Sequence, residues 1–244
     1  MSESKRINGN RTAKDLVREY YRELYNPKIN TKSENPKQEI VEKTTSIKGV
    51  NLSDYILLPS HDIYVAKERT LQGKDWYEAH EELHKQDARM LTLKEFADFL
   101  LLLKSGNAED GLGSKISKSE LDNLYLNITE VRNPYRAEWL DANFKVINGD
   151  LHINYNHRIV NKKLIPKNSE PLETCVMKNC KVDLSSFNKQ GLPTKKGTDF
   201  NYWCPVNGNV ARFVAGAGWA YLYCGGYPDS SDGDLGVRLA RENF

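Results

Sequence analysis

The chain reads VNGNVARFVAGAGWAYLYCGGYPDSSDGDLGVRLAR over residues 206–241. Between Arg212 and Asp234 this stretch holds five glycines, one tryptophan and three tyrosines, and serine and aspartate residues follow Pro228. Glycine permits tight turns, tyrosine and tryptophan offer rigid contact area, and serine and aspartate offer adaptable hydrogen bonds. Such a composition is typical of a binding surface built from loops. The alternating run Leu235–Arg241 then predicts a buried strand that closes the domain.

Length and charge place this stretch in one large domain with an N-terminal extension. The chain has 244 residues, which is enough to bury a sizeable core. Residues 1–51 are rich in charged and polar side chains and predict an extension, in which Thr12–Tyr25 has the pattern of one amphipathic helix. The globular domain is expected over residues 52–244.

Composition argues against several classes of partner. The 35 basic and 33 acidic residues nearly cancel, so no strong field favours nucleic acid. A membrane-spanning helix needs about 20 apolar residues, and the longest apolar run, Phe99–Leu103, is far shorter. The N-terminus, MSESKRINGNRTAK, lacks the apolar core of a secretory signal. We therefore expect no membrane span and a cytoplasmic protein by default, with virion or surface display as the alternatives.

Local patterns predict the elements of the domain. Apolar runs predict strands, apolar residues at helical spacing predict helices, and Thr92 with Glu95 forms a capping box. The expected elements are strands at Tyr55–Leu58 and Ile63–Ala66, two main helices at Asp75–Ala88 and from Thr92 to about Ser105, and a further short helix at Glu120–Ile128.

A hairpin is the strongest signal in the middle of the domain. The Asn148-Gly149 pair lies between two alternating segments, which is typical of a tight turn between antiparallel strands. On the first of these segments, Trp139 is expected in the core and Asp141 is expected to face outward. Residues 161–207 are expected to be loop-rich, with order only at Glu173–Val182.

The sequence contains HEELH, which matches the H-E-x-x-H zinc motif. On a helix this spacing puts His80 and His84 on one face to bind zinc, with Glu81 as the general base for hydrolysis. A catalytic zinc needs a third protein ligand, and no glycine and histidine continuation follows. A half-exposed amphipathic helix is therefore favoured, and a zinc-dependent hydrolase is kept as an alternative. His152 and His157 are expected to be hydrogen-bonded surface residues.

Four cysteines are present, at positions 175, 180, 204 and 224. Their number would allow two disulfides or one tetrahedral zinc site, but the C-x-x-C knuckle of most zinc sites is absent. We therefore expect free thiols. Neither a cofactor nor a metal ligand is expected, and no residue is expected to be catalytic.

Two parts of the domain together resemble a known fold family. Asp75–Ala79 and Arg89–Phe96 resemble the W-x-x-A … R-L-P-T-x-x-E-W helix pair of the formylglycine-generating-enzyme type of C-type lectin fold. Val210–Phe213, Trp219 and Leu235–Ala240 resemble the R-G-G-S-W … G-F-R-L-A ending of that superfamily. The resemblance implies an α+β, loop-rich C-type lectin fold with two helices and small antiparallel sheets.

Within this superfamily, the closer resemblance is to the variable proteins of diversity-generating retroelements, in particular archaeal members. Arg132–Ala142 and Val210–Phe213 carry this likeness. Such retroelements mutate template adenines, often in asparagine codons, and the products include the residue types that fill residues 210–238. The resemblance implies a receptor-type protein without enzyme activity, which binds a protein or glycan through a hypervariable C-terminal surface.

The resemblance also divides this segment into two sets of positions. The expected binding or variable positions are Val214, Gly216, Gly218, Trp219, Tyr221, Tyr223, Gly225, Gly226, Tyr227, Asp229, Asp232 and Asp234. The positions expected to be retained for packing are Ala215, Ala217, Ala220, Leu222, Cys224 and Pro228. A near-alternating order of the two sets suits a scaffold with an interchangeable surface.

Two further classes of protein stay open. The oxidase branch of the superfamily needs two closely spaced cysteines in its C-terminal segment to bind copper, whereas only Cys224 lies there, so formylglycine generation is disfavoured. A structural or assembly protein, which would associate through the N-terminal helix and the loop surface, is the other class. The oligomeric state stays open.

Overall fold

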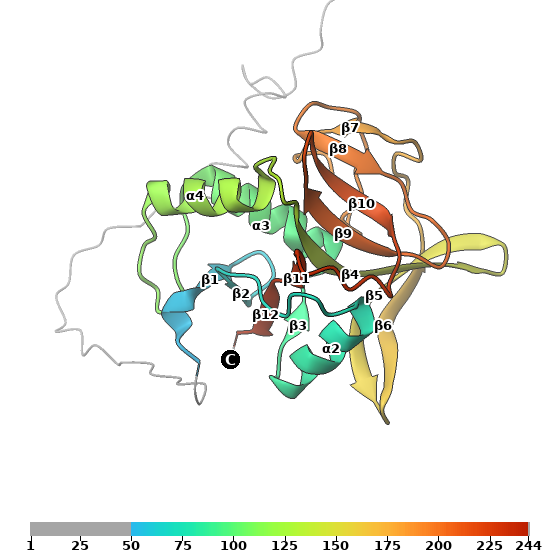
Figure 1. The fold of residues 1–244 in the computed structure, drawn as a ribbon, viewed down its shortest axis with the longest axis horizontal. Coiled ribbons are helices and arrows are strands. Elements are labelled where there is room, and N and C mark those ends of the chain that lie inside the picture. The colour runs from blue at the N-terminus through green and yellow to red at the C-terminus, as the bar shows by residue number, and fades with distance from the viewer. Residues whose placement is uncertain (1–49, 244) are drawn as a thin grey trace, which may run out of the picture. The chain divides into compact units, whose positions relative to one another are not determined.

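Two β-sheets and three α-helices form the described part of the chain, residues 50–243, in this computed structural model (Figure 1). The helices are α2 (Trp76–Lys85), α3 (Leu93–Ser105) and α4 (Lys118–Thr129), and the short 3-10 helix η1 (Leu52–Asp54) precedes them. The fold class is therefore α+β, as expected. The helix expected at Thr12–Tyr25 lies outside the described residues.

The smaller sheet joins the first and last strands of the described chain. Its order is β1-β2-β12-β3. The strands are β1 (Tyr55–Leu58), β2 (Ile63–Ala66), β3 (Arg89–Met90) and β12 (Leu239–Glu242). β1 and β2 form where apolar runs predict them. β12 pairs antiparallel with both β2 and β3, so the C-terminal strand connects two segments that would otherwise not be paired.

The larger sheet is mixed rather than antiparallel. Its order is β6-β5-β4-β9-β10-β8-β7, and β11 pairs with β4. The β10–β8 and β11–β4 pairs are parallel, so the expectation of small antiparallel sheets is wrong here. Its strands are β4 (Arg136–Ile147), β5 (Asp150–Val160), β6 (Lys163–Pro171), β7 (Cys180–Val182), β8 (Phe200–Trp203), β9 (Val210–Ala215), β10 (Ala220–Gly226) and β11 (Leu235–Val237).

The single closing strand expected at Leu235–Arg241 is two strands. β11 pairs with β4 in the larger sheet, whereas β12 pairs with β2 and β3 in the smaller one. Arg238 lies between them, and only 2% of its surface is exposed. Every residue from 235 to 241 is buried, because this segment passes from one sheet to the other through the core.

The hairpin signal is confirmed. Asn148 and Gly149 turn from β4 to β5 with φ of 53° and 95°, as tight hairpin turns require. β5 then turns into β6, and the two form the long yellow hairpin in Figure 1. The expectation of loop here is wrong, because β6 is a largely exposed edge strand whose Pro166 and polar residues obscure alternation. Within Glu173–Val182, only the last three residues form a strand.

Capping boxes lie at the start of two helices, and the one at Thr92 was predicted from the sequence. The Glu78 N–H donates to Asp75 Oδ1 at 2.7 Å at the start of α2, and Thr92 with Glu95 forms the second capping box at the start of α3. α3 ends at Gly106, which has a φ of 69°. The short helix expected near Glu120 is the three-turn α4, so the fold has one more full helix than the resemblance implies. None of the helices in residues 50–243 is long and apolar enough to cross a membrane.

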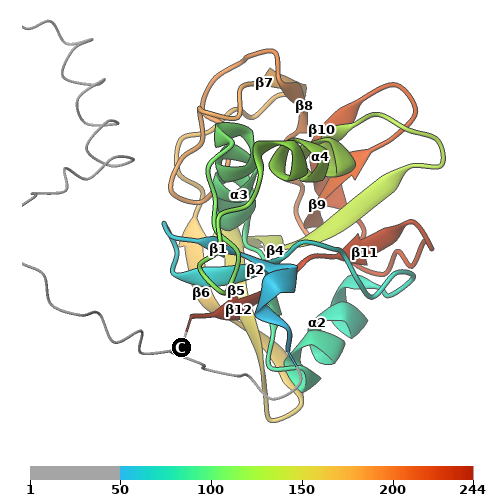
Figure 2. The same cartoon turned by 90° about the vertical axis from the view of Figure 1, so that its left-hand side faces the viewer.

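Strand β9 is buried on both faces, because its alternate side chains enter two hydrophobic clusters. Ala211 and Phe213 belong to the cluster that includes the apolar face of α3. Val210 and Val214 belong to a second cluster, which contains the apolar face of α2 and Trp139. Figures 1 and 2 show α3 and α4 beside each other and apart from α2. As expected, Trp139 lies in the core and is 1% exposed.

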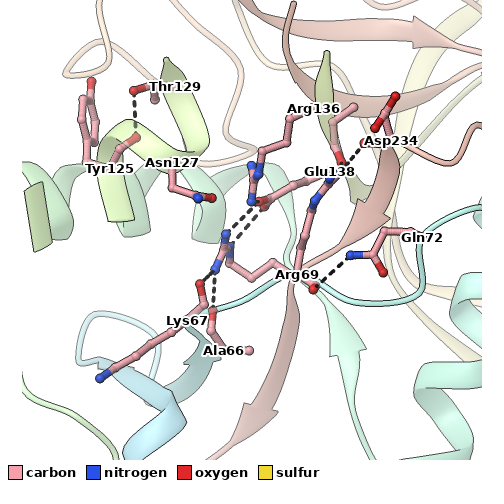
Figure 3. A network of polar contacts seen from close by, with 12 residues as sticks. Ala66, Lys67, Arg69, Gln72, Tyr125, Asn127, Thr129, Arg136, Glu138 and Asp234 are labelled. Atoms are coloured by element: carbon pink, nitrogen blue, oxygen red, sulfur yellow. Dashed lines mark hydrogen bonds and ion pairs between the residues drawn. The ribbon is translucent and has the colours of Figure 1, made fainter. Parts of the chain in front are cut away.

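A buried ion network joins the C-terminal segment to β4 (Figure 3). Glu138 has no exposed surface; it accepts hydrogen bonds from Arg238 at 2.8 and 3.2 Å and another from Arg136. Arg238 also donates to the carbonyl oxygens of Ala66 and Lys67. Burial would raise the pKa of Glu138, but the charges of Arg238 and Arg136 lower it to about 2. The carboxylate therefore stays charged and ties the segment between β11 and β12 to the larger sheet.

Candidate functional site

Strand β10 presents alternate side chains to the core and to the outside. Leu222 and Cys224 are 3% and 0% exposed and belong to the cluster that includes α3. Tyr221 and Tyr223 are partly exposed, and Tyr223 lies opposite Arg212 of β9. Because side chains alternate across a strand, packing constrains one face of β10 and leaves the other available for contact.

An aromatic cluster covers this outer face. β8 runs parallel to β10 and pairs Trp203 with Tyr223. The ring centroid of Trp203 lies 4.6 Å from that of Tyr221 and 6.2 Å from that of Tyr223, and the two tyrosine centroids are 6.1 Å apart. These distances fall in the range of roughly 4.5–7 Å in which aromatic pairs attract. Trp203 was missed from the sequence because β8 has only 4 residues, too few for a clear periodic signal.

A hollow of about 420 Å³ opens at the turn between β9 and β10. In this turn the Gly216 N–H donates to the carbonyl oxygen of Trp219 at 3.2 Å. Gly218 has a φ of 122°, a value that favours glycine. Trp219 is 54% exposed. The residues that line the hollow are Tyr135, Arg212, Val214, Gly216, Ala217, Trp219 and Tyr221.

Arg212 is the charged residue among those that line the hollow. Its guanidinium lies 5.7 Å from the ring centroid of Trp139 and 5.3 Å from that of Tyr223, within the range of cation–π attraction. Its Nε is buried and has no hydrogen-bond partner among the described residues. The sequence expectation omitted Arg212, although a single arginine inside the apolar run VARFVA is a signal that could have identified it.

Tyr135 connects the hollow to the loop after β10. Burial and the nearby carboxylate of Asp232 raise the pKa of Tyr135 to about 12. The phenol therefore keeps its proton at neutral pH and can donate a hydrogen bond. In the same loop Tyr227 is 65% exposed and Asp229 is also exposed. Tyr135 and Asp232 therefore link the hollow to the loop that follows β10.

The structure places most of the expected binding positions at least partly at the surface. The exposed ones are Gly218, Trp219, Tyr227, Asp229 and Asp232. The partly exposed ones are Gly216, Tyr221, Tyr223 and Asp234. The buried ones are Val214, Gly225 and Gly226.

The three buried positions are corrections to the expected surface. Val214 is 3% exposed and packs in the cluster that includes α2, although it touches the hollow. A Cβ on Gly226 would lie 3.1 Å from a backbone oxygen of β9, and one on Gly225 would lie 3.1 Å from the ring of Tyr223. Conversely, Ala217 was expected to serve packing but is exposed. The position of a residue in the backbone, rather than its type, therefore determines whether it is buried or exposed.

The two histidines of HEELH do not meet at one site. His80 is 4% exposed, and its Nε2 lies 3.8 Å from Asp141 Oδ1, whereas His84 is exposed. Within residues 50–243, the potential metal-binding atoms that gather within 4.8 Å of one another belong to His80, Asp141 and His157. Glu81 and His84 are not in this group. The motif therefore contributes only His80 to this cluster, and the other two members come from outside the motif.

Asp141 and His157 were expected at the surface, but their side chains are buried. The side chain of Asp141 has no exposed area, and that of His157 has 5%. His157 Nδ1 lies 2.5 Å from Asp141 Oδ1, and the His157 N–H donates to Asp141 Oδ2 at 2.9 Å. The pairing of β4 with β9 shifts register between Trp139 and Asn143. Asp141 nevertheless lies two residues after Trp139 and so shares its face of β4, where His80 of α2 packs; alternation itself puts Asp141 inside, and the outward prediction was wrong.

All four cysteines are free, as expected. Burial raises the pKa of Cys224 well above its ordinary value, and burial also raises the pKa of Cys175. A protonated thiol is a poor nucleophile and a poor metal ligand. These two thiols therefore give no support to the copper oxidase alternative.

Comparisons of the chain with models of known protein families, with curated proteins and with solved structures found no match. The structure establishes an α+β protein in which a mixed sheet presents an aromatic hollow at its C-terminal segment. The C-type lectin fold and the retroelement relationship are taken up below as proposals.

Proposed function

We propose that this protein is a receptor-type ligand-binding protein of the C-type lectin fold, similar to formylglycine-generating enzyme, with a hypervariable surface in residues 210–238 that a retroelement diversifies. The observation that carries the proposal is the alternation on β10. Leu222 and Cys224 are buried, while Tyr221 and Tyr223 face outward beside the hollow. A strand built in this way can change its outer residues without changing its packing. No catalytic residue is assigned.

The residues that carry the family resemblance have structural roles, and this supports the proposed fold. Trp76 is 1% exposed, and its indole N–H donates to the carbonyl oxygen of Leu140 at 3.0 Å. Arg89 binds both carboxylate oxygens of Glu95, at 2.7 and 2.8 Å. Arg238 donates hydrogen bonds to the buried carboxylate of Glu138. Motifs used in this way belong to a scaffold rather than to a reaction site.

We expect the partner to present an acidic group next to an apolar one. The hollow offers exposed aromatic area at Trp219 and a positive charge at Arg212. Arg212 lines the hollow, so its guanidinium charge can attract a carboxylate that enters the hollow, although its Nε atom is itself buried. Hydrogen bonds between ionised groups are stronger than neutral ones. An acidic side chain of a protein or an acidic sugar of a glycan fits this chemistry.

The proposal that a retroelement diversifies residues 210–238 is tested by sequencing the DNA that flanks the coding sequence. We expect a near-copy of the codons for residues 210–238 that differs almost only at template adenines, together with a nearby reverse transcriptase gene. Flanking DNA with neither feature would contradict hypervariability by this route.

The binding part is tested with two display libraries of the full chain. The first randomises the exposed positions Trp219, Tyr227, Asp229 and Asp232, and the control randomises the buried positions Leu222 and Cys224. We expect the first library to keep folded display and to yield binders to purified target proteins. The control library should lose display because its substitutions disrupt the core. Equal loss of display in both libraries would contradict an interchangeable surface.

A further inference from the structure

Three buried side chains from separate elements meet beneath Trp76, away from the aromatic hollow. His80 lies on α2, Asp141 on β4 and His157 on β5. One ligand-type atom from each lies within 4.8 Å of the other two. The ring centroid of Trp76 lies 4.3 Å from that of His80 and 4.9 Å from that of His157, edge to face, so both imidazoles are confined.

His80 has no polar partner in this cluster. It is 4% exposed, and its buried Nε2 forms no hydrogen bond among the described residues. A buried polar atom without a partner is costly and calls for an explanation. The carboxylate oxygen Asp141 Oδ1 lies 3.8 Å from His80 Nε2, which is too far for a hydrogen bond.

The separations suit a small divalent ion. Zinc lies about 2.0–2.2 Å from nitrogen and carboxylate ligands, so one ion can bridge atoms up to roughly 4 Å apart. The 3.8 Å between His80 Nε2 and Asp141 Oδ1 satisfies this limit. His157 Nδ1 and Asp141 Oδ1 lie 2.5 Å apart and share a hydrogen bond. An ion would replace the proton of that bond and separate the two atoms by about 1 Å more, to tetrahedral spacing.

We propose that His80, Asp141 and His157 bind one divalent transition-metal ion, with zinc as the first candidate. Two imidazoles and one carboxylate favour zinc or a similar ion over calcium or magnesium, which prefer all-oxygen sites. Asp141 is oriented by the backbone N–H of His157 at 2.9 Å, as metal-binding carboxylates commonly are. Three protein ligands leave a fourth position for water. His157 and Trp76 also line a second hollow of about 310 Å³, through which an ion could enter.

This metal site is independent of the proposed binding surface. Its residues lie on α2, β4 and β5, whereas the aromatic hollow is lined from β9, β10 and Tyr135. A bound ion would connect α2 to the β4–β5 hairpin.

Cobalt(II) is a suitable spectroscopic probe of the site. The full chain is treated with a chelator, dialysed and titrated with Co²⁺ and then with Zn²⁺. We expect one equivalent of Co²⁺ to bind with visible ligand-field absorption, which Zn²⁺ then abolishes. Zinc should also raise the melting temperature of the wild-type chain, whereas Mg²⁺ should not. Absence of both the absorption and the thermal shift in the wild-type chain would overturn the proposal without any variant.

Variants then assign the ligands. His80→Gln and Asp141→Asn should weaken Co²⁺ binding by more than about 100-fold, since loss of an outer-shell partner alone costs about 10–100-fold. His84→Gln, on the same helix, is the matched control and should bind as the wild type does. Loss of binding in His84→Gln with retention in His80→Gln would instead favour the HEELH site and overturn this one. Circular dichroism of each metal-free variant verifies that it is folded.

Discussion

Glu138 is a carboxylate that the fold keeps charged in the core. Its ordinary pKa is 4.5, and in the folded protein Arg238 and Arg136 lower it to about 2 against the effect of burial. A group whose pKa is lowered on folding stabilises the fold at pH values above its unfolded pKa. That contribution is lost as the pH falls from about 4.5 toward 2.

We therefore expect Glu138 to contribute to acid sensitivity. Protonation of Glu138 should lower the free energy of unfolding by about 3 kcal/mol between neutral pH and pH 2. Glu138→Gln should remove this part of the pH dependence and cost about 3–5 kcal/mol at pH 7, because it leaves two buried arginines without their partner. Urea unfolding at a series of pH values measures both effects. An equal pH slope in the wild type and the variant would contradict the assignment.

The exposed aromatic side chains should contribute to binding and not to stability. Trp219 and Tyr227 are 54% and 65% exposed. We expect Trp219→Ala and Tyr227→Ala to change the free energy of unfolding by no more than about 0.5 kcal/mol, while weakening capture of a ligand selected on the wild-type surface. Leu222→Ala, at a position 3% exposed, is the control and should cost about 2–5 kcal/mol. A loss of that size in Trp219→Ala would mean that the side chain belongs to the core.

At the level of elements, the β9–β10 pair limits which glycines can change. Gly226 lies opposite Val210 in this pair, and a Cβ there would come within 3.1 Å of the Val210 carbonyl oxygen. Gly233, in the following loop, has no atom within 4 Å of such a Cβ. Of these two positions, only Gly233 has room for a side chain.

This difference gives a matched test. We expect Gly226→Ala to destabilise the fold by about 1–3 kcal/mol, as overpacking does, and Gly233→Ala to be close to neutral. Thermal and urea unfolding of the two variants measure the difference. If both substitutions are equally tolerated, the backbone of β10 can shift and Gly226 returns to the set of changeable positions.

At the level of the whole described domain, β12 is the strand that completes the smaller sheet. It pairs with β2 on one side and with β3 on the other, although these strands lie far from it in sequence. The Arg238 guanidinium, just before β12, reaches Glu138 of the larger sheet. The two sheets therefore depend on the same few C-terminal residues.

A chain that ends at Arg238 should not fold cooperatively. Removal of β12 leaves β2 and β3 without their shared partner and takes away the buried Leu239 and Ala240, so the core residues that they cover become exposed. We expect the cooperative thermal transition to disappear in circular dichroism. Glu242→Gln, which removes only the ion pair with Arg89 at the partly exposed edge, is the control and should cost no more than about 1 kcal/mol. A cooperative transition in the shortened chain would show that the smaller sheet is dispensable.

Much of the domain was predictable where the signal is local. The capping box of α3 and the turn at Asn148 each depend on residues within a few positions of one another. The edge strand β6 was not predictable in this way, because an exposed strand with Pro166 in it has neither strict alternation nor an apolar run. For the candidate site, composition correctly predicted exposed aromatic residues such as Trp219 and Tyr227 but missed Arg212 and Trp203.

The sequence by itself determined the α+β class, the helix starts, the main hairpin and the presence of exposed aromatic residues in the C-terminal segment. These features follow from backbone preferences and from the periodicity of neighbouring side chains, which act over a few residues. Only the tertiary structure decided that residues 235–241 divide between two sheets, that Val214 and Gly226 are buried, and that His80, Asp141 and His157 meet. Strand pairing between distant segments decides these features, because register determines which face each side chain takes and which residues it contacts.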